Sequence, residues 1–165
     1  MEVLLTQAKR SDLEKIVSTY NSTILSSNIT ADLEPVTVKS KLEWFKNHSI
    51  TKRPLWIILL NGEYAGWMSF SSFYGRPAYD GTVEVSIYLE ESTRGLGVGK
   101  ACLNRAFSEC SQLKIKTLLG FIFDTNEKSL KLFYKMGFEK WGHLPKIANM
   151  INQEVGLVIV GKRIT

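Results

Sequence analysis

Residues that form disulfides or metal sites are scarce in this 165-residue sequence. Its only cysteines, Cys102 and Cys110, lie eight residues apart in a segment predicted to be helical, which puts their Cα atoms ~12 Å apart. A disulfide needs Cα atoms within ~7 Å, so we expect two free thiols. The two histidines, His48 and His143, are far apart and lack a cluster of cysteines or carboxylates, so we expect no metal site.

The sequence also lacks long hydrophobic runs and a secretion signal. No apolar run approaches the ~18–20 residues that cross a bilayer, and residues 1–10 lack the basic region and the long apolar region of a signal peptide. No Pro-, Gly- or Ser-rich linker, repeat or low-complexity tract divides the chain. We therefore expect a cytoplasmic protein with no membrane partner, in which residues 1–165 form a single domain.

The positive charge is concentrated in one part of the chain. The net charge is +5, but residues 94–146 contain ten Lys and Arg against four Asp and Glu, whereas the preceding residues have a small acidic excess. A local basic excess favours an anionic ligand. The mixed signs elsewhere argue against a nucleic-acid partner.

The hydrophobic pattern alternates between strand and helix periods, which predicts an α/β fold with a mixed sheet of about six or seven strands. We expect strands at residues 3–7, 55–60, 64–70, 82–89, 117–123, 138–144 and 155–163. We expect helices after a capping box at residues 11–14, from Thr37 through Phe45, over residues 98–113, and from Asn126 to Gly137. The dipeptide Asn61-Gly62 predicts a tight hairpin between the second and third strands.

A glycine-rich segment, residues 92–100, lies between a predicted strand and a predicted helix. Free backbone N–H groups and the positive end of a helix favour an anion there, although three glycines alone could form only a flexible turn. Gly95, Gly97 and Gly99 do not match the dinucleotide-binding fingerprint, and Lys100 is followed by Ala101 rather than the Ser or Thr of a Walker A loop.

The segment instead matches the pattern Arg-x-x-Gly-x-Gly at Arg94, Gly97 and Gly99, and the pairs Asn126-x-x-Ser129 and Gly137-Phe138 follow at a matching distance. In these motifs and in its order of elements the chain resembles the GNAT superfamily of N-acetyltransferases. The stretches at residues 20–23, 75–79 and 84–88 further resemble the bacterial phosphinothricin acetyltransferases.

This resemblance implies a GNAT-like mixed, mostly antiparallel sheet flanked by about four helices. It implies acetyl-CoA as the acetyl donor, with no metal. The residues expected to contact it lie on one strand (Ile87, Tyr88, Leu89), in the glycine loop (Arg94, Gly95, Leu96, Gly97, Val98, Gly99, Lys100) and on the predicted helix from Asn126 to Gly137 (Asn126, Ser129, Phe133).

Glu84 is the candidate general base. It is a lone carboxylate between Val83 and Val85 on the strand before the glycine loop, and burial would raise its pKa toward that of a useful base. The alternatives are an exposed residue or an ion-pair partner. The resemblance places it at the glutamate of the phosphinothricin group and assigns the oxyanion to backbone N–H groups of residues 85–87.

The resemblance leaves the general acid unassigned. Many relatives have a tyrosine, and some a histidine, at the position of Phe133. Tyr134 is adjacent, but one helical step turns a side chain by ~100°. A thiol pKa of roughly 8.5 makes the thiolate a tolerable leaving group, so turnover without an acid is feasible.

The segment of residues 70–80 is the candidate acceptor site. It concentrates aromatic residues and one arginine, and an arginine can clamp a carboxylate or phosphinate. The residues expected to contact the acceptor are Phe73, Tyr74, Arg76, Tyr79, Val85 and Ser86. Core packing of the aromatic side chains and a solvated arginine are the alternative interpretation.

The resemblance implies an acceptor such as phosphinothricin, methionine sulfoximine or methionine sulfone, acetylated on its α-amino group, and a homodimer. Gly156 stands where the group often has an aspartate, so a polar anchor of the acceptor or dimer region is absent. Two alternatives remain open: an acetyltransferase of a protein, peptide or other small amine, and a non-catalytic acyl-CoA-binding module, against which Glu84 argues.

Overall fold

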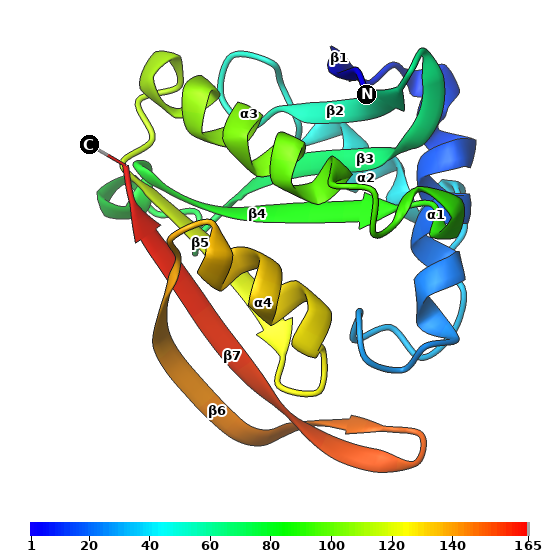
Figure 1. Ribbon diagram of the computed structural model, residues 1–165, viewed down its shortest axis with the longest axis vertical. Helices are drawn as coiled ribbons and strands as arrows, with labels where there is room; N and C mark the ends of the chain where they lie inside the picture. Colours follow the sequence, from blue (N-terminus) through cyan, green and yellow to red (C-terminus); the bar gives the residue numbers. More distant parts are fainter. Residues whose placement is uncertain (165) are drawn as a thin grey trace.

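The computed structural model describes residues 1–164, which fold around one seven-stranded sheet (Figure 1). The strand order is β1-β2-β3-β4-β5-β7-β6, and β4–β5 is its parallel pair. The strands are β1 (Val3–Gln7), β2 (Leu55–Leu60), β3 (Glu63–Ser72), β4 (Thr82–Leu89), β5 (Thr117–Phe123), β6 (Glu139–Met150) and β7 (Gln153–Arg163). The α-helices are α1 (Leu13–Ile24), α2 (Leu42–Lys46), α3 (Val98–Gln112) and α4 (Glu127–Lys135). The predicted α/β fold with a mixed, mostly antiparallel sheet is confirmed.

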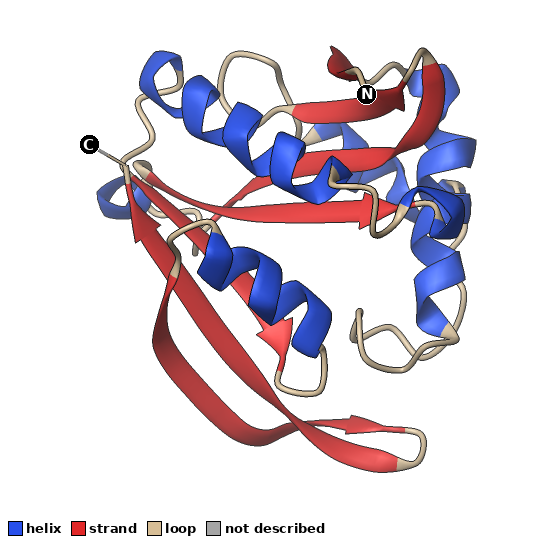
Figure 2. Ribbon diagram, viewed as in Figure 1, coloured by secondary structure: helices blue, strands red, loops and turns tan. Residues whose placement is uncertain are grey.

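Helices cover both faces of the sheet, and the alternation of side chains along each strand decides which residues each helix contacts. On one face, α1 packs Leu13 and Ile16 against Ile57 and Trp67. On the other face, α3 and α4 contribute to the larger core, which includes Val83 and the other strand residues of that face. Figure 2 shows α3 and α4 in front of the sheet. No helix within residues 1–164 is long and apolar enough to cross a membrane.

Most predicted elements agree with the structure to within a residue or two, but the helix starts in the first half of the chain do not. The predicted capping box at residues 11–14 is wrong: a 3₁₀ turn (Arg10–Asp12) precedes α1, and the Asp12 carboxylate accepts the N–H of Lys9 at 2.7 Å. Thr37 does accept the N–H of Ser40 at 3.1 Å. A 3₁₀ turn follows it, so α2 itself is short.

The last hairpin is longer than the sequence indicated. Strands β6 and β7 extend to Met150 and back from Gln153, and Figure 1 shows this hairpin projecting from the body of the structure. Most side chains of β6 are exposed. A strand without a buried face has no regular apolar alternation, which explains why the prediction stopped at residue 144.

The hairpin between β2 and β3 turns at Asn61 and Gly62, as predicted, and both residues have positive φ (50° and 86°). Gly66 lies further along β3, next to a register shift in β2, with φ +148°. A Cβ atom on Gly66 would lie 2.1 Å from the carbonyl oxygen of Tyr88. Only glycine therefore lets β3 approach β4 this closely, whereas nothing lies within 4 Å of a Cβ atom on Gly62.

Replacing these two glycines by alanine separates backbone strain from steric overlap. Gly62→Ala adds only the cost of a positive φ, roughly 1 kcal/mol. Gly66→Ala adds a collision with the backbone of β4, which we expect to lower the free energy of unfolding by about a further 1–3 kcal/mol. Urea denaturation of the two variants measures the difference. Equal losses would show that the contact between β3 and β4 is not tight.

Candidate active site

The parallel strands β4 and β5 are paired at only three positions, from Thr82 opposite Thr117 to Glu84 opposite Leu119. Beyond these positions the two strands diverge (Figure 1), while residues 85–89 remain paired with β3. The sheet therefore opens into a fork directly after Glu84. We use the term fork for this opening between β4 and β5.

Part of the backbone of β4 points into the fork. The N–H of Glu90 donates to the carbonyl of Ala65 at 2.9 Å, which fixes the alternating hydrogen-bond pattern between β4 and β3. By this alternation, Ile87 and Leu89 direct their N–H and C=O groups away from β3. Within residues 1–164, β5 gives these residues no strand partner, and only the Leu89 carbonyl accepts a bond, from Arg94 Nε at 3.1 Å. The two N–H groups are therefore available to a ligand.

The glycine loop follows β4 and leads into α3. Gly95 and Gly97 have φ of 76° and 85°, and Gly97 is the left-handed N-cap of α3 without a side-chain cap. The first N–H groups of this helix are therefore open to an anion. A Cβ atom on Gly99 would lie 2.8 Å from Leu132 Cδ2, so the start of α3 packs closely on α4. Arg94, Leu96 and Lys100 are exposed, and Val98 is buried.

Helix α4 contributes the remaining residues of the predicted donor site. Asn126 is its N-cap and accepts the N–H of Ser129 at 3.2 Å. Phe133 is buried, with its ring centroid 4.8 Å from that of Phe138. Tyr134 is 41% exposed and does not face the core. Phe133 thus presents only a hydrocarbon ring.

Glu84 lies on the opposite face from Val83 and Val85, toward α1 and α2. Burial raises the pKa of Glu84 above its usual range, and a hydrogen bond from Ser86 Oγ at 3.4 Å opposes this effect weakly. Among residues 1–164, no lysine or arginine nitrogen lies within 4.0 Å of its carboxylate. The ion-pair alternative is therefore absent from the described structure.

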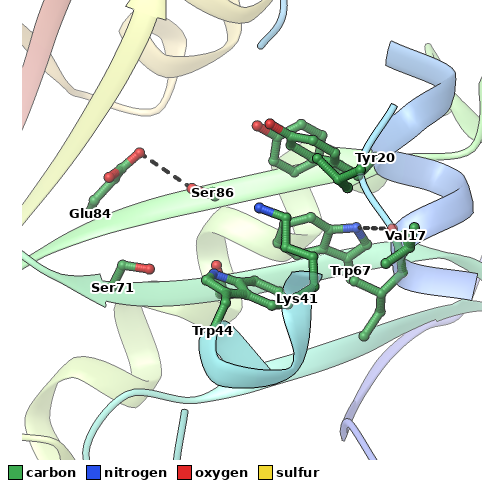
Figure 3. A pocket seen from close by; sticks show the side chains of 12 residues that line it. Val17, Tyr20, Lys41, Trp44, Trp67, Ser71, Glu84 and Ser86 are labelled. Atoms are coloured by element: carbon green, nitrogen blue, oxygen red, sulfur yellow. Dashed lines mark hydrogen bonds between the residues drawn. The ribbon is translucent and has the colours of Figure 1, made fainter. Parts of the chain in front are cut away.

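A cavity of about 200 Å³ lies beside Glu84, between the sheet and helices α1 and α2 (Figure 3). Its polar floor comes from β3 and β4, where Ser69 is opposite Ser86 and Ser71 is opposite Glu84. Within residues 1–164, the hydroxyls of Ser69 and Ser71 have no hydrogen-bond partner. The candidate base therefore belongs to a concave polar surface.

The walls of the cavity are aromatic. Trp67 stacks on Tyr88 with ring centroids 4.6 Å apart, Trp44 meets Trp67 edge-on at 5.4 Å, and Tyr20 lies 5.2 Å from Tyr88. Lys41 Nζ lies 5.1 Å from the centroid of the Tyr20 ring. Sequence reasoning missed Trp44, Trp67 and Lys41 as site residues, because their patterns are also those of ordinary core and surface positions.

The predicted acceptor residues of the loop between β3 and β4 do not line this cavity. Phe73 contacts Tyr74 and Tyr79 (ring centroids 4.7 and 5.5 Å) and stacks on Phe121 of β5. Tyr74 is 78% exposed, and Arg76 is also exposed. This aromatic group contacts β5 and does not line the cavity. Of the other two predicted residues, Ser86 lines the cavity, whereas the side chain of Val85 is buried in the core of the other face.

Gly156 has a structural reason for lacking a side chain. Its N–H donates to Asp124 Oδ1 at 3.1 Å, and Asp124 Oδ2 lies 3.0 Å from His143 Nε2. A Cβ atom on Gly156 would lie 2.3 Å from Asp124 Oδ2 and 2.6 Å from His143 Nε2. The pair of Asp124 and His143 thus occupies the space that an aspartate side chain would need.

Comparison with known proteins gives relatives over nearly the whole chain. YwnH of Bacillus subtilis (strain 168), a candidate phosphinothricin acetyltransferase, is 48% identical over 159 residues, which cover 96% of this chain and 97% of that protein. The L-methionine sulfoximine/L-methionine sulfone acetyltransferase of Salmonella typhimurium (strain LT2) is 24% identical over 140 residues, covering 85% and 82% of the two chains.

Solved structures and a family model agree with these relatives. The phosphinothricin acetyltransferase of Sinorhizobium meliloti in complex with acetyl-CoA superimposes with a TM-score of 0.92 at 25% identity, covering 99% of this chain and 89% of that one. The model of the acetyltransferase (GNAT) family matches residues 10–138. The fork, the glycine loop and the cavity therefore lie within a shared fold, and the chain belongs to the acetyltransferase (GNAT) family.

Proposed function

We propose that this acetyltransferase transfers the acetyl group of acetyl-CoA directly to the α-amino group of a small amino-acid-like acceptor, with Glu84 as the general base. One observation carries the proposal: Glu84 stands where the sheet opens, with free backbone amides in the fork on one side and a small cavity on the other.

We also propose that residues 1–165 act as one domain, and that the protein is cytoplasmic, in keeping with its two free thiols.

The residues of the chain fit acetyl-CoA. The open N–H groups at the start of α3, flanked by Arg94 and Lys100, suit a pyrophosphate. The free N–H group of Leu89 suits an amide carbonyl of a pantetheine arm, because that arm would extend the sheet along the unpaired edge of β4. The structure of the Sinorhizobium meliloti relative contains acetyl-CoA, which supports this assignment. When bound, acetyl-CoA supplies an acetyl thioester that is activated for attack by an amine.

Glu84 would remove the proton that the acceptor amine loses as it attacks. A base works best when its pKa is near the working pH, and burial raises the pKa of Glu84 in that direction. Ser86 donates to the same carboxylate and so orients it. The backbone N–H of Ile87, which points into the fork, is a donor for the developing oxyanion.

The leaving thiolate departs without a general acid on α4, because Phe133 has no ionisable group. A covalent intermediate on the enzyme is also disfavoured. Burial raises the pKa of both Cys102 and Cys110 to about 12, so neither thiol forms a nucleophilic thiolate near neutral pH. Direct transfer to the amine is the mechanism that these residues support.

The acceptor class follows from the size of the cavity and from the relatives. A cavity of about 200 Å³ suits an amino acid better than a protein segment. The named relatives act on phosphinothricin, methionine sulfoximine or methionine sulfone, and we propose acceptors of this kind. Contacts from Phe73, Tyr74, Arg76 and Tyr79 to the acceptor remain a prediction.

We further propose a homodimer. The hairpin of β6 and β7 exposes Trp141, Leu144, Ile147 and Ile151, which are 41–70% accessible. Several exposed apolar side chains along one hairpin are typical of an interaction surface. Sedimentation equilibrium would give about twice the 18.7 kDa mass of one chain.

Replacing the proposed base removes the proton acceptor while keeping its shape. We expect Glu84→Gln to lower kcat by roughly 100-fold or more at neutral pH with the Kd of acetyl-CoA unchanged. In the unaltered enzyme, kcat/KM should fall as the pH is lowered through the raised pKa of Glu84, because protonation inactivates the base. Release of free coenzyme A measures both. The control is Glu63→Gln, which removes an exposed carboxylate of β3 and should leave kcat unchanged. An unchanged kcat in Glu84→Gln would exclude Glu84 as the base.

Blocking the backbone of the glycine loop tests the donor site. We expect Gly97→Val to weaken acetyl-CoA binding by roughly tenfold or more, because a branched side chain is strained at φ +85° and obstructs the start of α3. Gly62→Val is a matched control, with φ +86° in a hairpin away from the loop. Isothermal titration calorimetry gives the Kd of each variant. Equal affinity in both variants would contradict the role of the loop.

A further inference from the structure

Resting on the N-acetyltransferase function proposed above, we propose that Lys41 binds the α-carboxylate of the acceptor in the cavity beside Glu84. The acceptor is then a free α-amino acid that presents its amine to Glu84 and its α-carboxylate to Lys41. This inference assigns the carboxylate to α2 and its preceding turn, rather than to Arg76 in the loop between β3 and β4.

The first argument for this proposal is the position of Lys41. Its Nζ lies 5.1 Å from the ring centroid of Tyr20 and 5.8 Å from that of Trp44, and Figure 3 shows it directed into the cavity between these rings. Within residues 1–164, no carboxylate lies within 4.0 Å of this nitrogen. A partly buried ammonium group without a protein counter-ion can bind an anionic ligand without breaking an existing ion pair.

The second argument is the distribution of charge in the cavity. Among the residues that line the cavity, Lys41 is the cation and Glu84 is the carboxylate. They come from opposite sides, Lys41 from the turn before α2 and Glu84 from β4. An α-amino acid carries an amine and a carboxylate on one carbon atom, and in this cavity its amine would face Glu84 while its carboxylate faces Lys41. The small volume favours the α-carboxylate over a more distant anionic group.

The third argument concerns the side chain of the acceptor and comes from the aromatic walls of the cavity. Trp67 Nε1 donates to the carbonyl of Ile16 at 3.1 Å, and the hydroxyl of Tyr20 is bonded to Thr30 and Asp32. The polar atoms of Trp67 and Tyr20 are therefore engaged with protein. These two residues offer the cavity ring surface, which suits the apolar or sulfur-containing part of an acceptor side chain.

The test measures binding rather than turnover. Trp44 and Trp67 line the cavity, so quenching of tryptophan fluorescence reports its occupancy. The probes are L-methionine sulfone and its carboxamide, which differ at the carboxylate. We expect the unaltered protein to bind the acid at least tenfold more tightly than the amide, and Lys41→Met to remove this preference by weakening only the acid. Lys41→Arg should restore most of it.

Two further variants make the test specific. Lys39→Met removes an exposed charge two residues away and should leave both affinities unchanged. Arg76→Met tests the competing arginine. The inference is overturned if Lys41→Met leaves the affinity for the acid unchanged, if it weakens acid and amide equally, or if only Arg76→Met removes the preference.

Failure of the inference is distinguishable from failure of the proposed function. Transfer of acetyl groups only to amines without a carboxylate, such as polyamines, would overturn the inference and keep an N-acetyltransferase. Carboxylate-dependent binding through Lys41 without acetyl transfer would keep the subsite and remove the proposed reaction. If neither probe binds to the unaltered protein, the inference is wrong.

Discussion

The incomplete pairing of β4 with β5 is the constraint on which the rest of the site depends. A strand inside a sheet normally has its N–H and C=O groups bonded on both edges, because unpaired buried polar groups are costly. Here the pairing ends at Glu84, and the next residues of β4 keep only the partner on their β3 edge. A ligand with amide groups can take the place of the absent strand. The fold thus holds a ready set of backbone donors open without using a side chain.

The alternation of residues along β4 separates the two halves of the reaction. Even-numbered side chains, which include Glu84 and Ser86, face α1 and α2 and contribute to the cavity. Odd-numbered side chains, which include Val83 and Val85, fill the core beneath α3 and α4. Because the backbone N–H groups of Ile87 and Leu89 point sideways into the fork, the donor and the acceptor can reach the same segment from different directions. The candidate base therefore stands between them.

The sequence predicted those parts of the structure that depend on local patterns. The bounds of β4 and β5, the turn at Asn61, and the cap at Asn126 follow from alternation and from turn or cap preferences of neighbouring residues. The strand order and the separation of the two strands beyond Glu84 are not local properties. No local pattern predicted either of them. The mixed, mostly antiparallel sheet came from resemblance to a known family, and the structure confirms it.

The cavity was not predictable from the sequence, since it is formed by segments far apart in the chain. Lys41 ends the 3₁₀ turn before α2 and Trp44 lies in α2, and the pattern of this segment resembles that of any surface helix. Trp67 is one aromatic residue in an apolar strand. By contrast, the dense aromatic run around Phe73 suggested a pocket, but its rings contact one another and Phe121 outside the cavity. Aromatic density in sequence does not reveal which surface the rings face.

The fork itself can be tested by amide hydrogen exchange of the protein with and without acetyl-CoA. The account predicts that saturating acetyl-CoA slows exchange at Ile87 and Leu89, whose N–H groups point into the fork, and at the start of α3. Exchange at Ser86, which is paired with β3, should change little. If acetyl-CoA binds and the amides of Ile87 and Leu89 exchange as before, the fork is not the donor site and the central claim is wrong.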